Sequence, residues 1–181
     1  MKLKLPIGVC VLISLALVVF GLIFGTVSGF ADERRQVTAL LEGENGLMDV
    51  LSYRGADGLN LCVVARRHLP QADEDVTALE AAAKALRTAG GKLADKKAQD
   101  AGLEEAVSAV SAKLKEAESF QRSERDQRYL DMLISDLQSL RASAVVTSYN
   151  QAASDFNSQL SGPVSGVLAR LLGVEPCALY E

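Results

Sequence analysis

Three consecutive side chains in the first half of the chain have the chemistry for acid–base catalysis or anion binding. Arg66, Arg67 and His68 precede Pro70, and His68 is the only histidine in the sequence. As a general base, His68 would need a nucleophile or an acid close to it in space. However, no nucleophile motif, glycine-rich phosphate loop or set of metal ligands accompanies the histidine. The sequence therefore indicates, first, a basic turn at a helix end, where cations interact favourably with the helix dipole.

An acidic run follows this basic turn. Asp73, Glu74 and Asp75 have the side chains of calcium or magnesium ligands, but no His, Cys or suitably spaced carboxylate completes a site. Acidic residues are favoured in the first turn of a helix, so we expect the run to begin one. No cofactor or metal is expected. The cysteines are isolated and include no CxxC pair for zinc or redox chemistry: Cys10, Cys62 and Cys177.

An aromatic residue followed by asparagine occurs twice near the C-terminus, at Tyr149-Asn150 and at Phe156-Asn157. Seven residues are about two helical turns, so the two pairs share one helix face. The aromatic rings are expected to pack inside the protein. Asparagine is a middling helix former, so we expect both amides to hydrogen-bond to a neighbouring helix or loop and to fix its register, with ligand contact as the alternative.

Helices must position these residues, and helical periodicity is what the sequence provides. Ala, Leu, Glu, Lys and Gln dominate, prolines number four, and strand signals are absent. Helices are predicted at residues 72–91, from Leu103 to Ala117, along one continuous inner face from Leu130 to Leu160, and from Val164 to Leu172. The region after residue 37 is predicted as a weaker helix, because Gly43, Gly46, Gly55 and Gly58 each cost about 1 kcal/mol in a helix interior.

The chain begins with a short basic segment, residues 1–4, and continues with an uncharged stretch, residues 5–31. A membrane-spanning helix needs about 20 apolar residues, so this stretch is long enough. The alternative is a cleaved signal, since Lys2 and Lys4 form a basic start and small residues follow the apolar run. That run exceeds the roughly 7–15 residues of a signal core, which favours an uncleaved single-pass anchor. Basic residues flank both ends, so the orientation stays open.

We therefore expect an all-α protein with an N-terminal transmembrane helix at 5–31, an elongated antiparallel helical bundle at 32–162, and a short C-terminal helix and tail at 163–181. Helices with one apolar face are marginal alone in water, so they must pack together. The same face suits an internal bundle or a coiled-coil homodimer. The net charge of −4 comes without a basic stripe, so nucleic acid is not an expected partner.

Two regions of the sequence resemble the LemA family. The run from Ser139 to Glu181 has two aromatic-Asn pairs seven apart, a proline after the helix at Pro163, and an Ala-, Leu- and Gly-containing tail that ends at Tyr180-Glu181. The stretch VVARRHLPQADEDV, residues 63–76, is similar to the family's Arg-Arg segment before a Pro-containing turn. The N-terminal span fits the family as well. The glycines of SYRGADGLN, residues 52–60, depart from the family's continuous helix.

The resemblance implies a membrane-tethered helical bundle of the bacterial cell envelope with no established enzymatic activity and an accessory role. We accordingly expect a non-catalytic interaction protein at the cell membrane, whose partner is a membrane protein or a second copy of the chain. Its candidate interaction or register residues are Tyr149, Asn150, Phe156, Asn157, Arg66 and Arg67.

The apolar residues of 164–172 are the expected docking face, unless they pack into the bundle. Truncation after Gly162 should then abolish partner capture and leave the helical signal largely intact. Two alternatives remain. Arg66, Arg67 and His68 could form a small-molecule or enzymatic site with acids from another helix, and the two arginines could instead contact anionic lipid headgroups.

Overall fold

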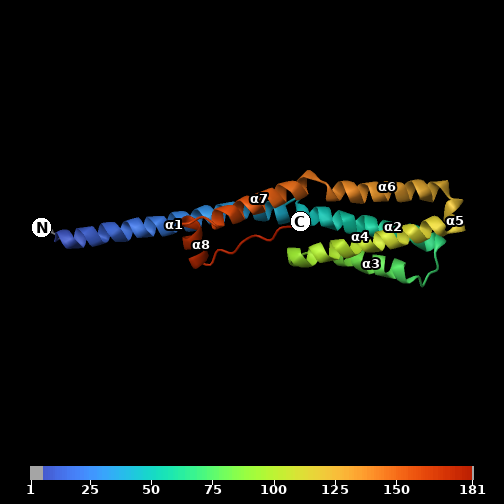
Figure 1. The fold of residues 1–181 in the computed structure, drawn as a ribbon, viewed down its shortest axis with the longest axis horizontal. Helices are drawn as coiled ribbons and strands as arrows, with labels where there is room; N and C mark the ends of the chain where they lie inside the picture. The colour runs from blue at the N-terminus through green and yellow to red at the C-terminus, as the bar shows by residue number, and fades with distance from the viewer. Residues whose placement is uncertain (1–5, 181) are drawn as a thin grey trace. The chain divides into compact units, whose positions relative to one another are not determined.

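The computed structural model describes residues 6–180, so the basic start with Lys2 and Lys4, and the final Glu181, lie outside the described residues. The described part contains eight helices and no strand (Figure 1), which confirms the predicted all-α fold. In chain order the helices are α1 (Ile7–Glu42), α2 (Leu47–His68), α3 (Glu74–Arg87), α4 (Leu93–Glu116), α5 (Glu118–Gln121), α6 (Glu124–Arg141), α7 (Ala144–Leu160) and α8 (Ser165–Leu171).

The chain divides into two compact units, each with its own packing. The first unit contains Met1–Thr38 and Ala152–Cys177, and the second contains Ala39–Gln151 and Ala178–Glu181. The first unit therefore holds most of α1, the second half of α7, and α8. The second unit holds the helical bundle from α2 to α6.

Helix α2 is the centre of the second unit, where it packs against α3, α4 and α6 (Figure 1). Leucines fill this core because they recur three and four residues apart on the inner faces. Leu61 of α2, Leu79 of α3, Leu103 of α4 and Leu133 of α6 are all buried. Burying one leucine side chain contributes about 1.5–3 kcal/mol, so this layer supplies much of the stability of the bundle.

Helix α3 begins as the acidic run predicts. The Asp73 side chain accepts hydrogen bonds from the backbone N–H groups of Asp75 (3.0 Å) and Val76 (3.2 Å), which makes it the N-cap. At the other end, Nζ of Lys96 donates to three backbone carbonyls of α3 and its C-cap, including that of Leu86 at 2.9 Å. Side chains therefore satisfy backbone groups at both ends of this helix.

Helix α2 forms as predicted in this region and is continuous through Gly55 and Gly58, despite the low helix propensity of glycine. A Cβ at Gly55 would lie 2.7 Å from the carbonyl oxygen of Ala83, and one at Gly58 would lie 2.7 Å from Cδ1 of Leu103. The two glycines let α3 and α4 approach α2 closely, and this packing compensates for their low helix propensity. The chain does break between α1 and α2, where Asn45 adopts a φ of 59°.

The prediction of one continuous helix from Leu130 to Leu160 is wrong, because the helix breaks at residues 142–143 and the chain forms two helices, α6 and α7. Three β-branched residues, 145–147, follow the break, and such residues are weaker helix formers. The break shifts the inner face by changing the register. In α7 that face consists of Val146, Tyr149, Ala153, Phe156 and Leu160, whereas Ala144 and Ser148, which one unbroken helix from Leu130 would turn inward, are exposed.

In the first unit, α1 packs against the second half of α7. The rings of Phe30 and Phe156 meet edge to face with their centroids 5.9 Å apart. Arg34 of α1 donates a hydrogen bond to the carbonyl oxygen of Glu175 (3.4 Å). Helix α8 turns back on the end of α7, and its small residues Gly166 and Ala169 are buried. The long N-terminal helix is thus joined to the C-terminal segment of the chain.

Candidate functional site

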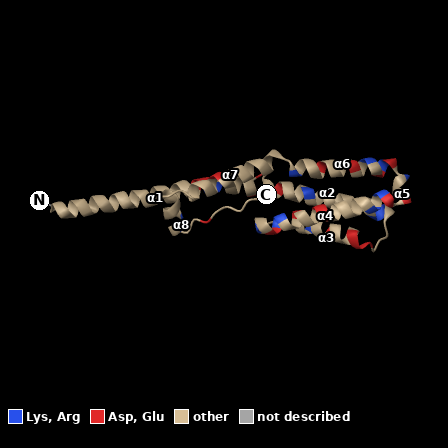
Figure 2. Ribbon diagram, viewed as in Figure 1, with Lys and Arg blue, Asp and Glu red and all other residues tan. Residues whose placement is uncertain are grey.

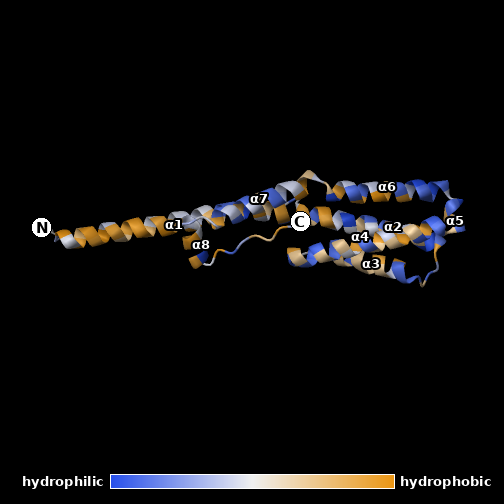
Figure 3. Cartoon of the chain, in the orientation of Figure 1, coloured by the Kyte–Doolittle hydropathy of each residue, from blue (hydrophilic) through white to orange (hydrophobic). Residues whose placement is uncertain are grey.

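The N-terminal part of α1 is an exposed apolar surface. Residues 6–25 are all exposed, and Leu12, Leu17 and Phe20 are each at least 66% exposed. Figure 3 shows this stretch as hydrophobic, and Figure 2 shows that it carries no charge. Among the described residues, this is the one helix long and apolar enough to cross a membrane, by length and composition. So much exposed apolar area is unfavourable in water.

The second aromatic-Asn pair of α7 holds the C-terminal tail, residues 174–180, at a position in the first unit. The side-chain amide of Asn157 makes two hydrogen bonds with the backbone of Cys177. Its Nδ2 donates to the Cys177 carbonyl oxygen, and its Oδ1 accepts from the Cys177 N–H, each over 2.8 Å. Phe156 is buried against Phe30. The ring of Phe156 therefore packs inside the unit, while the amide of Asn157 hydrogen-bonds to the backbone of the tail.

The first aromatic-Asn pair makes the same kind of contact within the second unit. Oδ1 of Asn150 accepts a hydrogen bond from the N–H of Tyr180 (2.9 Å). The hydroxyl of Tyr149, which is otherwise buried, donates to the carbonyl oxygen of Ala178 (2.6 Å). Both asparagines thus bind backbone groups of the tail, and neither binds a neighbouring helix through these contacts.

The spacing of seven residues in α7 matches the geometry of an extended tail. Seven residues of helix rise about 10.5 Å. The three steps from Cys177 to Tyr180 extend about 10 Å in a strand-like segment. Asn150 can therefore meet Tyr180 while Asn157 meets Cys177, which accounts for the interval of seven residues between the two pairs.

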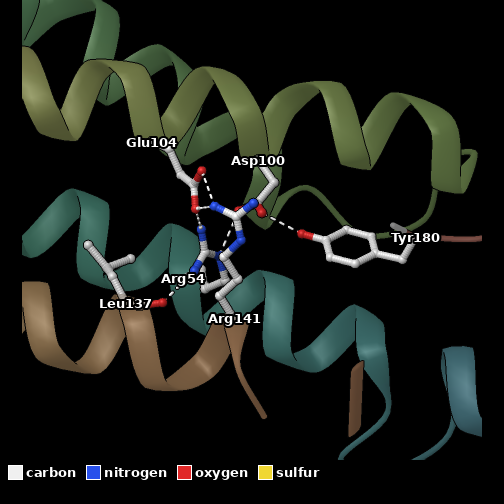
Figure 4. A network of polar contacts seen from close by, with 6 residues as sticks. All are labelled: Arg54, Asp100, Glu104, Leu137, Arg141 and Tyr180. Atoms are coloured by element: carbon white, nitrogen blue, oxygen red, sulfur yellow. Dashed lines mark hydrogen bonds and ion pairs between the residues drawn. The ribbon is translucent and has the colours of Figure 1, made fainter. Parts of the chain in front are cut away.

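The tail ends in a polar network inside the second unit (Figure 4). The Tyr180 hydroxyl donates to the carboxylate of Asp100 in α4. Asp100 also accepts from Nε of Arg54 (2.6 Å), a residue of α2 that is 2% exposed. The other donors of Arg54 go to Glu104 (3.1 Å) and to the backbone carbonyl of Leu137 in α6. One buried guanidinium thus connects three helices.

This network is costly to disturb, because a buried charge that loses its partner is strongly unfavourable. Burial raises the pKa of Tyr180, and its hydrogen bond to Asp100 raises that pKa further, so the hydroxyl stays protonated and donates. At the edge of the network, Arg141 pairs with Glu104. The tail is therefore part of the bundle's polar interior, so truncation after Gly162 removes a structural element as well as the expected docking face.

Sequence analysis missed Arg54, although the chain contains a signal for it. Arg54 interrupts a series of inner positions three and four residues apart: Leu47, Leu51, Arg54, Gly58, Leu61 and Ala65. A charged residue on such a face needs a buried partner. Its partner Asp100 lies in a helix that has few other distinguishing features.

The basic turn at the end of α2 is engaged within the bundle. Arg66 pairs with Glu80 of α3. Arg67 donates to Oδ1 of Asp126 in α6 at 2.9 Å. Both arginines remain about half exposed at the side chain, at 48% and 46% respectively. Their positive charges are therefore partly neutralised by carboxylates of the bundle itself.

His68 lies between Ser119 and Asp126, but its ring is reversed relative to the catalytic triad of hydrolases, in which Nε2 faces the serine and Nδ1 faces the acid. Its Nε2 lies 2.8 Å from Oδ2 of Asp126, and its Nδ1 lies 3.1 Å from Oγ of Ser119. The imidazole is buried and meets the ring of Phe120 edge to face. The hydrogen bond with His68 is the largest cause that holds the pKa of Asp126 below its usual value. Both ring nitrogens thus fasten α2 to α5 and α6.

A groove of about 810 Å³ lies between α4 and α6 in the second unit. Its lining includes the apolar residues Leu103, Val107, Ile134 and Leu137, and the charged residues Arg54, Glu104 and Arg141. Oγ of Ser111, which also lines the groove, is buried without a hydrogen-bond partner among residues 6–180. Within the same described range, no group of three or more His, Cys, Asp and Glu side chains is placed to hold a metal ion. The groove is thus suited to binding an apolar group.

Comparison of the chain with protein-family models, with curated proteins and with solved structures finds no match.

Proposed function

We propose that this chain is a single-pass membrane protein of the LemA type, whose helical bundle is a non-catalytic interaction module at the cell envelope. The observation that carries the proposal is the exposed apolar stretch of α1, residues 6–25, which continues without a break into a packed segment. Cleavage of a signal near Ala31 would separate Phe30 from Phe156, whose rings are in contact. Retention of the segment preserves this contact and therefore favours an uncleaved anchor.

Support for an interaction role comes from the second unit. The arginines of the basic turn form ion pairs within the bundle, whereas the groove between α4 and α6 is open. An apolar lining with charged residues beside it is the chemistry that an amphipathic helix of a partner protein matches. The proposed module therefore binds a helix of a membrane partner in this groove.

The anchor is tested by charging the middle of the span. Arginine at the centre of a membrane helix costs about 2.5–3.5 kcal/mol, so the double variant Leu15→Arg, Leu17→Arg should leave the membrane during an alkaline wash. The wild-type chain should stay in the membrane pellet. The matched control, Val63→Arg with Met132→Arg, charges two exposed apolar residues of the bundle and should also stay. Retention of the Leu15, Leu17 variant would refute the anchor.

The interaction role is tested by photo-crosslinking in native membranes. A benzophenone amino acid in place of Val107 or Ile134 lies in the groove, whereas one in place of Arg128 lies on an exposed side chain of α6. The proposal predicts a protein adduct from the two groove positions and none from Arg128. Absence of an adduct from both groove positions would contradict the proposed use of the groove.

The alternative is an enzyme that uses Arg66, Arg67 and His68, and the contact of His68 with both Ser119 and Asp126 favours it. A fluorophosphonate probe distinguishes the two functions, because it labels a serine activated by a neighbouring base. The interaction proposal predicts no labelling of Ser119. Labelling of Ser119 that disappears in His68→Ala, in a variant that still folds, would establish the alternative.

A further inference from the structure

Helix α8 exposes an apolar face although it is firmly seated. Val164, at the N-cap, and Leu171 are 78% and 79% exposed, and Val167 lies between them and is also exposed. Intervals of three and four residues place these side chains on one face. The opposite face carries Gly166 and Ala169, which are buried. The exposed face is therefore a fixed feature of the first unit.

The close contact with α7 fixes this orientation. A Cβ at Gly166 would collide with the carbonyl group of Leu160, the last residue of α7. The backbone N–H of Val174 donates to the carbonyl oxygen of Ala169, which closes the end of α8 (3.0 Å). A rotation of α8 that buried Leu171 would have to break both arrangements. The described chain therefore leaves this apolar face open to its surroundings.

Helix α8 lies where the exposed apolar stretch of α1 ends, within the same unit (Figure 1). Residues 6–25 of α1 are exposed, burial begins at Thr26, and Phe30 is packed on Phe156. In Figure 1, α7 runs antiparallel to α1 in this unit. Leu160 is four residues beyond Phe156, so the end of α7 lies about 6 Å closer to the exposed stretch.

The dimensions of a bilayer place α8 at the surface of the membrane that α1 is proposed to span. A span of about 20 residues crosses the hydrocarbon core, which corresponds to the stretch from Ile7 to Thr26. The segment just after Thr26, beside which α8 lies, then falls among the headgroups. An amphipathic helix in that layer buries its apolar face at the boundary between headgroups and acyl chains. Arg170 on α8 and Arg34 on α1 are exposed cations that suit anionic headgroups.

We propose that α8 is an interfacial helix, which inserts Val164, Val167 and Leu171 into the surface of the membrane that α1 spans. The inference rests on the proposed anchoring by α1 and adds a second membrane contact from the opposite end of the chain. The occupant of the apolar face is the lipid surface, because α8 belongs to the same compact unit as the apolar span. The C-terminal segment is thereby held beside the bilayer.

The absence of tryptophan from the sequence makes a direct test simple, since one introduced tryptophan is the sole indole reporter. Full-length Leu171→Trp is reconstituted in vesicles of neutral and anionic phospholipids, with bromine atoms placed either near the headgroups or near the chain ends. The proposal predicts a blue-shifted emission and loss of intensity with the shallow bromines. Val164→Trp, at a second exposed site, should behave alike and guards against a local defect in one variant.

Two matched variants separate this inference from the anchor. Phe20→Trp reports on α1 and should lose intensity with the deep bromines. Ser154→Trp, on the exposed side of α7 in the same unit, should lose intensity with neither. If the Leu171 and Val164 variants are unquenched while Phe20→Trp is quenched, the anchor holds and the interfacial helix is refuted. If Phe20→Trp is unquenched, the anchor itself fails.

Two other outcomes would also overturn the interfacial helix. Equal deep quenching of Leu171→Trp and Phe20→Trp would place α8 in the hydrocarbon core. A blue shift of Leu171→Trp in native membranes, without quenching in lipid vesicles, would show that a protein covers the apolar face.

Discussion

The double hydrogen bond between Asn157 and Cys177 makes Asn157→Ala the most informative single substitution. Alanine keeps the helix but removes the donor to the Cys177 carbonyl and the acceptor from its N–H, both at 2.8 Å. Each hydrogen bond contributes about 1 kcal/mol net, so the local opening of the tail becomes easier by about 2 kcal/mol. A factor of ten corresponds to about 1.4 kcal/mol, so the open population of the tail should rise about 30-fold.

Hydrogen–deuterium exchange of the full-length protein measures this opening directly. Peptides that cover residues 173–180 should exchange about 30-fold faster in Asn157→Ala, because exchange in native proteins tracks local opening. Asn150→Ala removes one hydrogen bond, to Tyr180, and should give about a 5-fold increase. The control is Ser158→Ala, an exposed neighbour on α7, which should leave exchange unchanged. Equal exchange of the tail in Asn157→Ala and Ser158→Ala would refute the role assigned to the asparagine.

Three further predictions concern the bundle. Arg54→Met should destabilise the bundle by about 3–5 kcal/mol, because the substitution leaves the Asp100 charge buried without its cation. Thermal unfolding followed by circular dichroism measures this loss, and a melting curve like that of wild type would contradict the network. Gly55→Ala should lower the melting temperature, because the added Cβ meets the Ala83 carbonyl. Gly102→Ala, in α4, places its Cβ in open space and should raise the free energy of unfolding by about 0.5–1 kcal/mol. A change of stability in the same direction for both variants would refute the packing argument. The pKa of Asp126 in the folded protein is below its usual 3.8, so the ionised carboxylate stabilises the fold above pH 3.8, and this stabilisation is lost as the pH falls through the folded pKa. The stability of Asp126→Asn, measured by acid unfolding, should accordingly fall less steeply than that of wild type in this acidic range.

Periodicity predicts the parts of this fold that depend on apolar faces. Leu130, Leu133 and Leu137 recur at intervals of three and four residues, and all three are buried. The acidic run at Asp73 predicts a helix start, and its side chain caps α3. These features follow from local sequence because burial and capping each act over one or two turns of helix.

The features that sequence analysis missed depend on contacts between distant residues. Tyr180 meets Asp100 across 80 positions, and the tail that carries it has no periodicity from which a partner can be read. Gly55 and Gly58 look like helix breakers, and only the approach of α3 and α4 explains them. The break between α6 and α7 was missed for a different reason, since helical periodicity on both sides of it conceals a change of register.

The mass of the membrane-bound chain shows whether α1 is the uncleaved membrane anchor that we propose. Membranes that contain the native protein are washed at alkaline pH, and the intact mass of the chain is determined in the pellet and in the supernatant. We expect the full-length chain of 19.3 kDa in the pellet. A chain that lacks its first 30 or so residues, released into the supernatant, would contradict it.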